Sequence, residues 1–397
     1  MRGISKRRIA GISGLAALVT FLWCGTASAA AWQVRAIDNT AMGQFSSLKI
    51  DAEGNAHVAY VLDTSDHLLR YGFWDHATDR WFTMTVAKGA EFCSLALDSK
   101  QHPHISYVDY GTQVGAKVRY AHWDGAAWKT EGIGPDTAGA IGFFTSIALN
   151  KDDHPIISYY DYAGPGGVFI LRLRTYAWNG RYWEARTADP EYGSGKFNSI
   201  AIDSAGNPHV AYANVGVMHA SLRYASWKGR QWNVEWVEGV KDAPAPLYPS
   251  IFPVYSVALV LDKSDSPHIT YTDLTAHQVK YAHWVGGKWQ TEVAGTMVNY
   301  AYPDRNGIAL DEEGNPYLSY YDSGRGVLLL AHREGKNWVA ETVDQNFAGY
   351  TSSIQIDRQT IFVTYGDRAG ALKVARRPLE VQSAVQEGPV PAERTRP

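Results

Sequence analysis

Cysteine, net charge and long apolar runs are all scarce in this 397-residue chain. Its two cysteines, Cys24 and Cys93, are too few for a disulfide framework. Lysines and arginines number 37 against 40 aspartates and glutamates, so the cationic surface of a nucleic-acid binder is not expected. After residue 29, no segment approaches the roughly 20 apolar residues of a membrane-spanning helix. We therefore expect a globular protein with no nucleic-acid partner and no transmembrane segment.

Aromatic residues, by contrast, are abundant. They make up 13% of the chain and include 14 Trp and 24 Tyr. Flat side chains of this kind pack well on pleated surfaces. No stretch after residue 29 has the 3.6-residue period of an amphipathic helix. The composition and the periodicity together indicate an all-β protein.

The first 29 residues have the pattern of a signal peptide. Basic residues between Arg2 and Arg8 precede the apolar stretch Ile9–Trp23, and residues Ala27–Ala29 form a small-residue cleavage site. We expect residues 1–29 to be removed and the mature chain to be exported, to the periplasm or to the extracellular space. A lipid anchor on Cys24 is the alternative, which the bulky indole immediately before it disfavours.

A short motif recurs seven times along the chain. Each copy is an apolar strand that ends in Asp or Asn, and 46 to 59 residues separate successive copies, which is the spacing of propeller blades. The seven copies are Ser47–Asp51, Ser94–Asp98, Ser146–Asn150, Ser199–Asp203, Ala258–Asp262, Gly307–Asp311 and Ser353–Asp357. Each is followed by a turn, a second strand with a repeated Tyr and a third strand, and six are then followed by a fourth strand that begins with Trp. The pattern predicts one seven-bladed β-propeller over residues 30–377.

The seventh repeat has no fourth strand of its own. The segment Trp32–Ile37 has the pattern of one, and pairing it with the segment around Leu372 would close the ring and remove its open edge. The remaining residues, 378–397, contain four Pro and no apolar period, so we expect a disordered tail.

The connections between strands differ in regularity. We name the four strands of a blade a to d. The a–b and c–d connections are uniform hairpins rich in Asp, Asn and Gly, whereas the intervals spanning the b–c and d–a connections vary from 9 to 16 and from 13 to 26 residues. In an up-and-down blade the two variable connections emerge on the same side. We call this side the loop face, and we expect it to carry the function. The acidic hairpins lack the ligand spacing of a calcium loop.

The loop face is rich in carboxylates and aromatic rings. The b–c loops open with Asp63, Asp109, Asp161, Asn214, Asp273, Asp322 and Asp367, and the d–a loops carry aromatic residues that include Phe144, Tyr192, Tyr255, Tyr302 and Tyr350. Such groups suit sugars, because rings stack on pyranose C–H faces while carboxylates and amides bond hydroxyls. Two alternatives stay open at this point. The carboxylates could cap their own loops, and the aromatic rings could plug the central channel.

The histidines and the remaining thiol fit structural roles better than catalytic ones. Four histidines, His57, His104, His209 and His268, occupy one repeat position, where packing between blades with bonded ring nitrogens is expected. They lack the spacing of a zinc site, so no metal or cofactor is expected. Cys93 adjoins an apolar strand, and we expect it to be buried and inert.

Units such as Ser94–Tyr107 resemble the repeats of secreted bacterial seven-bladed propellers. That group is loosely similar to sialidase-type (BNR) propellers and to the propeller-fold ulvan lyases. The resemblance covers nearly the whole mature chain, and it implies the fold rather than a chemistry. The sialidase Asp-box, Ser-x-Asp-x-Gly-x-Thr-Trp, is absent.

Two classes of function follow. The first is a binding module whose loop face recognises a glycan or a surface protein without catalysis. The second is a polysaccharide lyase that cleaves uronic-acid polymers by β-elimination, which requires a base, an acid and a cation to neutralise the substrate carboxylate. Candidates for the base and acid are His219, His277, Tyr160 and Tyr162, and candidates for the cation are Arg325 and Arg368. We favour binding, because no recurrent catalytic signature is present.

Overall fold

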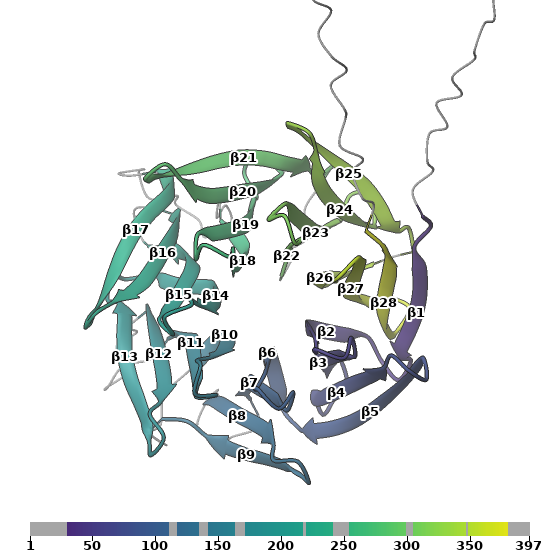
Figure 1. Ribbon diagram of the computed structural model, residues 1–397, viewed down its shortest axis with the longest axis horizontal. Coiled ribbons are helices and arrows are strands. Elements are labelled where there is room, and N and C mark those ends of the chain that lie inside the picture. Colours follow the sequence, from purple (N-terminus) through teal and green to yellow (C-terminus); the bar gives the residue numbers. More distant parts are fainter. Residues whose placement is uncertain are drawn as a thin grey trace, which may run out of the picture.

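Seven antiparallel four-stranded sheets make up the protein. The computed structural model describes residues 30–110, 117–134, 142–162, 171–216, 220–240, 254–298, 305–346 and 348–379. Figure 1 shows the sheets arranged in a ring, with strand a of each sheet nearest the axis and strand d at the rim. The chain is a seven-bladed β-propeller. Among the described residues, none form a helix with the length and apolar character needed to cross a membrane.

The strands follow the predicted order in every blade. The a strands are β2 (Gly43–Ile50), β6 (Ala90–Leu97), β10 (Gly142–Leu149), β14 (Ser194–Ile202), β18 (Tyr255–Leu261), β22 (Gly307–Leu310) and β26 (Ala348–Asp357). The b strands are β3 (Ala56–Leu62), β7 (Pro103–Asp109), β11 (Pro155–Asp161), β15 (Pro208–Val215), β19 (Pro267–Asp273), β23 (Pro316–Asp322) and β27 (Thr360–Asp367). The c strands are β4 (Leu68–Asp75), β8 (Lys117–Trp123), β12 (Arg172–Trp178), β16 (Ala220–Lys228), β20 (Gln278–Val285), β24 (Val327–Glu334) and β28 (Ala371–Pro378). The d strands are β5 (Arg80–Ala87), β9 (Trp128–Gly132), β13 (Trp183–Asp189), β17 (Gln231–Val240), β21 (Lys288–Thr296), β25 (Asn337–Asp344) and β1 (Gln33–Asp38). We number the blades 1 to 7 from β2 to β26.

The amino-terminal strand closes the ring, as predicted. β1 pairs antiparallel with β28 in a register that sets Gln33 against Arg376 and Asp38 against Leu372. β28 ends at Pro378, one residue beyond the expected boundary of the propeller. Residues 1–29 and 380–397 lie outside the described residues, so the signal peptide and the disordered tail stay predictions.

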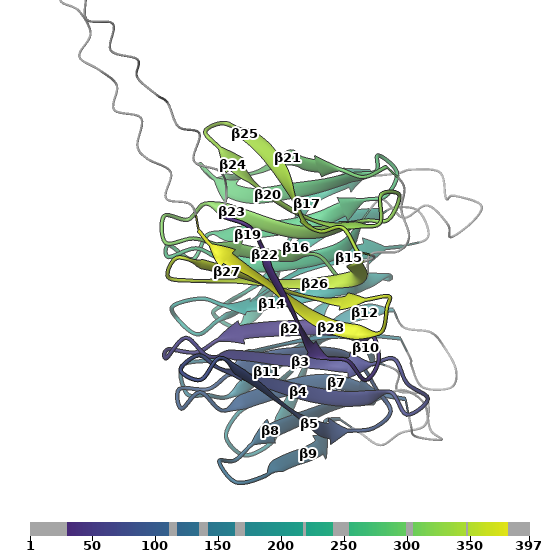
Figure 2. The same ribbon diagram turned by 90° about the vertical axis from the view of Figure 1, so that its right-hand side faces the viewer.

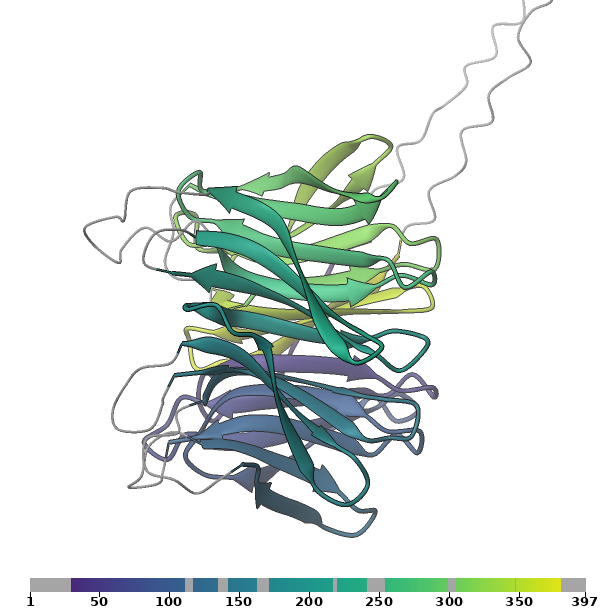
Figure 3. The ribbon, with the colours of Figure 1, turned by 90° about the vertical axis from the view of Figure 1, so that its left-hand side faces the viewer.

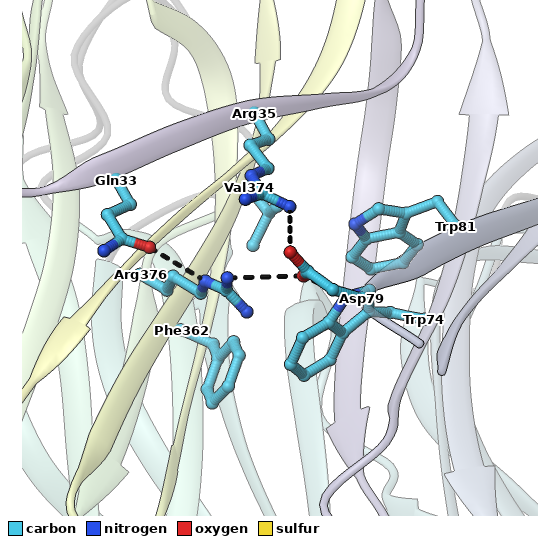
Figure 4. Close-up of a pocket in the computed structure, with 8 residues that line it drawn as sticks. All are labelled: Gln33, Arg35, Trp74, Asp79, Trp81, Phe362, Val374 and Arg376. Atoms are coloured by element: carbon cyan, nitrogen blue, oxygen red, sulfur yellow. Dashed lines mark hydrogen bonds and ion pairs between the residues drawn. The ribbon is translucent and has the colours of Figure 1, made fainter. Parts of the chain in front are cut away.

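A charged cluster at the rim fastens this closure. Asp79, in the c–d hairpin of blade 1, accepts hydrogen bonds from Arg35 of β1 at 2.6 Å and from Arg376 of β28 at 3.3 Å (Figure 4). Trp74 donates its indole N–H to the same carboxylate, and the Arg376 guanidinium lies 4.8 Å from the centre of the Trp74 ring. The cluster therefore bonds the two strands of the last blade to the first blade.

The repeated serines of the a strands explain part of the motif. An a strand has an unpaired inner edge, because no further strand lies inside it. The Ser47 hydroxyl accepts a hydrogen bond from the backbone N–H of Leu95 in the next blade at 3.0 Å, and Ser353 accepts one from Leu48 at 3.0 Å across the closure. Equivalent bonds join blades 2 to 3, 3 to 4 and 4 to 5. The serine thus satisfies an edge amide of the neighbouring blade.

The two faces of the ring are seen edge-on in Figures 2 and 3, where the strands run from one face to the other. The b strands are the most buried, because a blade packs on each side of them, and all seven residues of β3 are buried. The repeated Trp at the start of a d strand packs edge-on against a c-strand Tyr of the preceding blade, as Trp128 does against Tyr71 with ring centres 5.3 Å apart. The core therefore lies between the blades.

Candidate functional site

Three of the loop-face carboxylates cap their own loops. Asp322 is fully buried and accepts hydrogen bonds from the backbone of Gly324 and Arg325 and from the Arg325 Nε at 2.6 Å. Asp273 and Asp367 likewise accept hydrogen bonds from backbone amides two residues further along. The structure favours the capping interpretation for these three residues.

Other members of the set lie between strands. Asp109 is 3.4 Å from the Arg119 guanidinium, and buried Asp161 is 3.4 Å from that of Arg174. Asn214 is fully buried, and neither end of its side-chain amide finds a hydrogen-bond partner among the described residues. These three side chains are therefore placed to hold the b–c ends of blades 2, 3 and 4. Asp63, at the same position of blade 1, is exposed.

A second acidic layer joins neighbouring blades below the loop face. At the junction of blades 3 and 4, the Tyr212 hydroxyl donates a hydrogen bond to buried Asp189 at 2.7 Å, and Arg223 bonds Glu191 through both terminal nitrogens. Burial and the Asp189 carboxylate raise the pKa of Tyr212, which keeps the phenol protonated and able to donate. Equivalent Tyr–acid bonds occur at Tyr60, Tyr271 and Tyr365. The repeated Tyr of the b strand is thus an interblade hydrogen-bond donor.

Aromatic side chains fill part of the centre of the ring. Phe45, Phe92, Phe144 and Phe197 occupy one position of the a strands in blades 1 to 4, and their ring centres are 4.5 to 4.7 Å apart in succession. Tyr255 of blade 5 continues the row at 4.6 Å from Phe197. Each of the four Phe has a positive φ of 50–53° within an interruption of the strand register, so the backbone itself turns the ring inward. For Phe144 and Tyr255 this packing favours the channel-plug interpretation.

These phenylalanines line a central cavity with an empty volume of about 300 Å³, including open solvent. Asn198, Val257 and Arg305 complete its lining. Arg305 stands at the Phe position of blade 6 and donates from Nη1 to the carbonyl oxygen of Cys93 at 3.1 Å.

A second aromatic group lies on the loop face of blades 2 to 4, and we call it the mouth cluster: Tyr110, Phe143, Tyr160, Tyr162 and Tyr192. The Phe143 ring is 5.9 Å from Tyr110 and 5.7 Å from Tyr162, and Tyr160 is 6.3 Å from Tyr162. Tyr192 interacts electrostatically with Tyr160. Tyr110 and Tyr192 are 41% and 49% exposed, so the cluster presents ring surface to solvent. Tyr160 is buried, and its hydroxyl has no partner in the described part of the chain.

Charged groups flank the mouth cluster on both sides. Lys196, at the start of β14, places its amine 5.7 Å from the centre of the Tyr160 ring, and burial lowers the pKa of this amine. Glu91, at the start of β6, lies 3.7 Å from His67, and burial raises the pKa of this carboxyl group. Glu91 also interacts with Tyr110. The cluster therefore has a half-buried acid at one end and a half-buried amine at the other.

The lyase candidates are distributed over four blades. Tyr160 and Tyr162 belong to blade 3, His277 to blade 5, Arg325 to blade 6 and Arg368 to blade 7. The guanidinium of Arg325 bonds Asp322 and the Thr296 carbonyl, both of them structural groups. Three further candidates, His219, Tyr302 and the side chain of Tyr350, lie outside the described residues.

The repeated histidines have both ring nitrogens bonded. His57 bonds Asp51 at 3.2 Å through Nε2 and the Tyr71 hydroxyl at 2.6 Å through Nδ1, and His209 and His268 have equivalent partners. Cys93 is fully buried, and burial raises the pKa of its thiol to about 12. Among the described residues, no three His, Cys, Asp or Glu side chains group as metal ligands would.

Sequence predicted the loop face but not the members of the mouth cluster. Tyr192, Tyr160 and Tyr162 were candidates, whereas Tyr110, Glu91 and Lys196 were not. The usable signal for Glu91 and Lys196 was their repeat position, at the start of an a strand, where each blade has a different residue.

Comparison with known proteins finds similarity of structure alone. No family model matches the chain, and no curated protein matches its sequence. Many solved structures share the fold. A polysaccharide lyase described as a PL25 ulvan lyase, bound to -[GlcA(1-4)Rha3S]-, is 14% identical, with a TM-score of 0.56 over 85% of this chain and 94% of its own. The BP39L lectin from Burkholderia pseudomallei is 12% identical, with a TM-score of 0.57 over 86% of this chain and 96% of its own. The polysaccharide lyase Uly1 is 10% identical, with a TM-score of 0.51 over 84% and 90%.

Proposed function

We propose that the protein is an exported binding module that holds carbohydrate on the mouth cluster without cleaving it. The observation that supports the proposal is the exposed pair Tyr110 and Tyr192, which lies on the loop face beside further rings and two charged groups. Exposed aromatic surface of this kind is costly in water unless it serves a ligand. The fold is shared by a lectin and by polysaccharide lyases, which agrees with a carbohydrate ligand.

The chemistry of the cluster suits a sugar. A pyranose ring offers an apolar C–H face that can lie on Tyr110 or Tyr192, and its hydroxyls need directional polar partners. Glu91 can accept hydrogen bonds from such hydroxyls, and Lys196 can donate to ring or hydroxyl oxygens or to a sugar carboxylate. The acid and the amine lie on blades 2 and 4, with Phe143 of blade 3 between them in the ring order. An extended saccharide could therefore contact three blades at once.

Binding fits the geometry better than the lyase alternative does. A general base or acid must come within hydrogen-bond reach of the reacting proton. The hydroxyl of Tyr160 is buried, and burial raises its pKa, so it is poorly placed to abstract a proton near neutral pH. Arg325 is already bonded to Asp322, which reduces its capacity to neutralise a substrate carboxylate.

The test is a glycan array probed with the mature chain, followed by affinity measurement on the best ligand. We expect one class of saccharide to bind. We also expect Tyr110→Ala to weaken it about tenfold, the equivalent of roughly 1.4 kcal/mol of stacking energy. Incubation of the same chain with uronic-acid polymers should leave the ultraviolet absorbance flat. An array without binders would refute the proposal, and a rising absorbance would establish the lyase instead.

A further inference from the structure

Two cations in the middle of the ring break the repeat. Lys49 stands on β2 at a position that is Ala in four other blades, Ala96, Ala148, Ala201 and Ala309. Arg305 stands where blades 1 to 4 have Phe. Small or apolar residues are expected there, because the a strands face the crowded centre. Both cations therefore occupy places where the rest of the ring has no charge.

The described residues give these cations very little compensation. Arg305 lines the central cavity, and its one hydrogen bond within the described part of the chain goes to the neutral carbonyl of Cys93. No carboxylate of that same part forms a salt bridge with Arg305 or with Lys49, and the two cations interact electrostatically with each other. The one acidic group that interacts with Arg305 there is the Cys93 thiol, which stays protonated because burial raises its pKa to about 12.

Burying charge without a partner is expensive, and a like-charged neighbour adds to the cost. Lysine can escape this cost by releasing its proton, and burial together with the Arg305 charge does lower the pKa of Lys49. Arginine has no such escape, because its guanidinium stays protonated in proteins. Four of its five N–H donors also remain for another acceptor once Cys93 is bonded. A positive charge therefore stays in the cavity and calls for a counter-ion.

We propose that the central cavity binds a compact inorganic anion, held by Arg305 and assisted by Lys49. The phenylalanines provide dry walls, with the weakly positive edges of their rings available to the anion. The site is distinct from the mouth cluster, and it binds an ion rather than a sugar. It stabilises the ring from its centre, where the inner strands of blades 1, 2 and 6 meet the same charge.

Anion-dependent stability tests the site, with variants that restore the repeat. Thermal unfolding of the mature chain is followed at constant ionic strength in sodium chloride, sodium bromide or sodium MES, whose anion is a bulky sulfonate. We expect a midpoint higher by about 2 °C or more in the halides, and rising with the logarithm of halide concentration. Arg305→Phe and Lys49→Ala, the residues that other blades use, should reduce or abolish this difference. Lys88→Ala, which removes an exposed lysine paired with Asp66, should leave it unchanged.

A direct measurement covers the case in which a variant fails to fold. Crystals of the wild-type chain grown in bromide should show an anomalous peak next to the Arg305 guanidinium. A wild-type midpoint that does not depend on the anion, a halide response that persists in both consensus variants, or an empty cavity in bromide would each overturn the proposal.

Discussion

Arg305 and Cys93 are 212 residues apart in the sequence, yet the Arg305 guanidinium donates a hydrogen bond to the Cys93 carbonyl oxygen at 3.1 Å. The bond joins blade 6 to blade 2 across the centre of the ring. Together with the row from Phe45 to Tyr255, it occupies the centre with side chains. A polymer is therefore not expected to thread through the ring, and recognition of a large ligand is left to the loop face.

The interblade tyrosines should contribute measurably to stability. Tyr212→Phe removes the hydrogen bond to Asp189 and leaves a carboxylate that is 3% exposed with one donor fewer. We expect a loss of about 1–3 kcal/mol in the free energy of unfolding, measured by urea denaturation. Tyr320→Phe is the matched control, because no acid in the described part of the chain accepts a hydrogen bond from its hydroxyl, and a change below about 0.5 kcal/mol is expected. Equal losses in the two variants would contradict the assignment.

The junction between the last and first blades should tolerate no added side-chain volume. A Cβ at Gly366 of β27 would lie 2.1 Å from the backbone oxygen of Gly43 in β2. Gly366→Ala must push the two blades apart, so we expect a loss of about 1–3 kcal/mol or a failure to fold. Gly132→Ala, on the outer strand β9 with nothing within 4 Å of the added methyl, is the control and should change stability little. A neutral Gly366→Ala would show that the closure is looser than described.

Sequence predicted the ring because its repeats are set by local chemistry. The Asp turns, the b-strand Tyr and the d-strand Trp each recur because every blade solves the same packing problem, and the spare strand at Trp32–Ile37 completes the count. The mouth cluster depends instead on which loop residues converge from three blades, and the length of a loop does not determine where its side chains point. Arg305 was visible as a sequence position, but its reach to Cys93 depends on the curvature of the whole ring.

Stability should fall as the pH drops below the ordinary histidine range. Burial lowers the pKa of His57, His104 and His268 from 6.5, so the folded protein keeps these rings neutral while the unfolded chain protonates them. The unfolded state therefore binds more protons between the lowered values and pH 6.5, and the free energy of unfolding decreases through that window as acid is added. Asp51, held below its usual pKa by bonds from Asn55 and His57 in spite of its burial, adds a separate loss below about pH 3.8.

Urea unfolding at about pH 7.5 and about pH 5.5 measures this dependence. His104→Gln keeps a hydrogen-bonding side chain but cannot titrate, so its loss of stability between the two pH values should be smaller than that of the wild type. An identical pH dependence in the two proteins would show that His104 is already solvated in the folded state.

The binding proposal is tested most directly by two tyrosines of one blade. Tyr192 follows β13 on the loop face and is 49% exposed, whereas Tyr182 precedes β13 in the opposite hairpin and is 57% exposed. The affinity of the best saccharide is measured by titration calorimetry for Tyr192→Ala and for Tyr182→Ala. The account predicts about a tenfold loss for Tyr192→Ala and no change for Tyr182→Ala. Equal affinities in the two variants, or a loss confined to Tyr182→Ala, would contradict it.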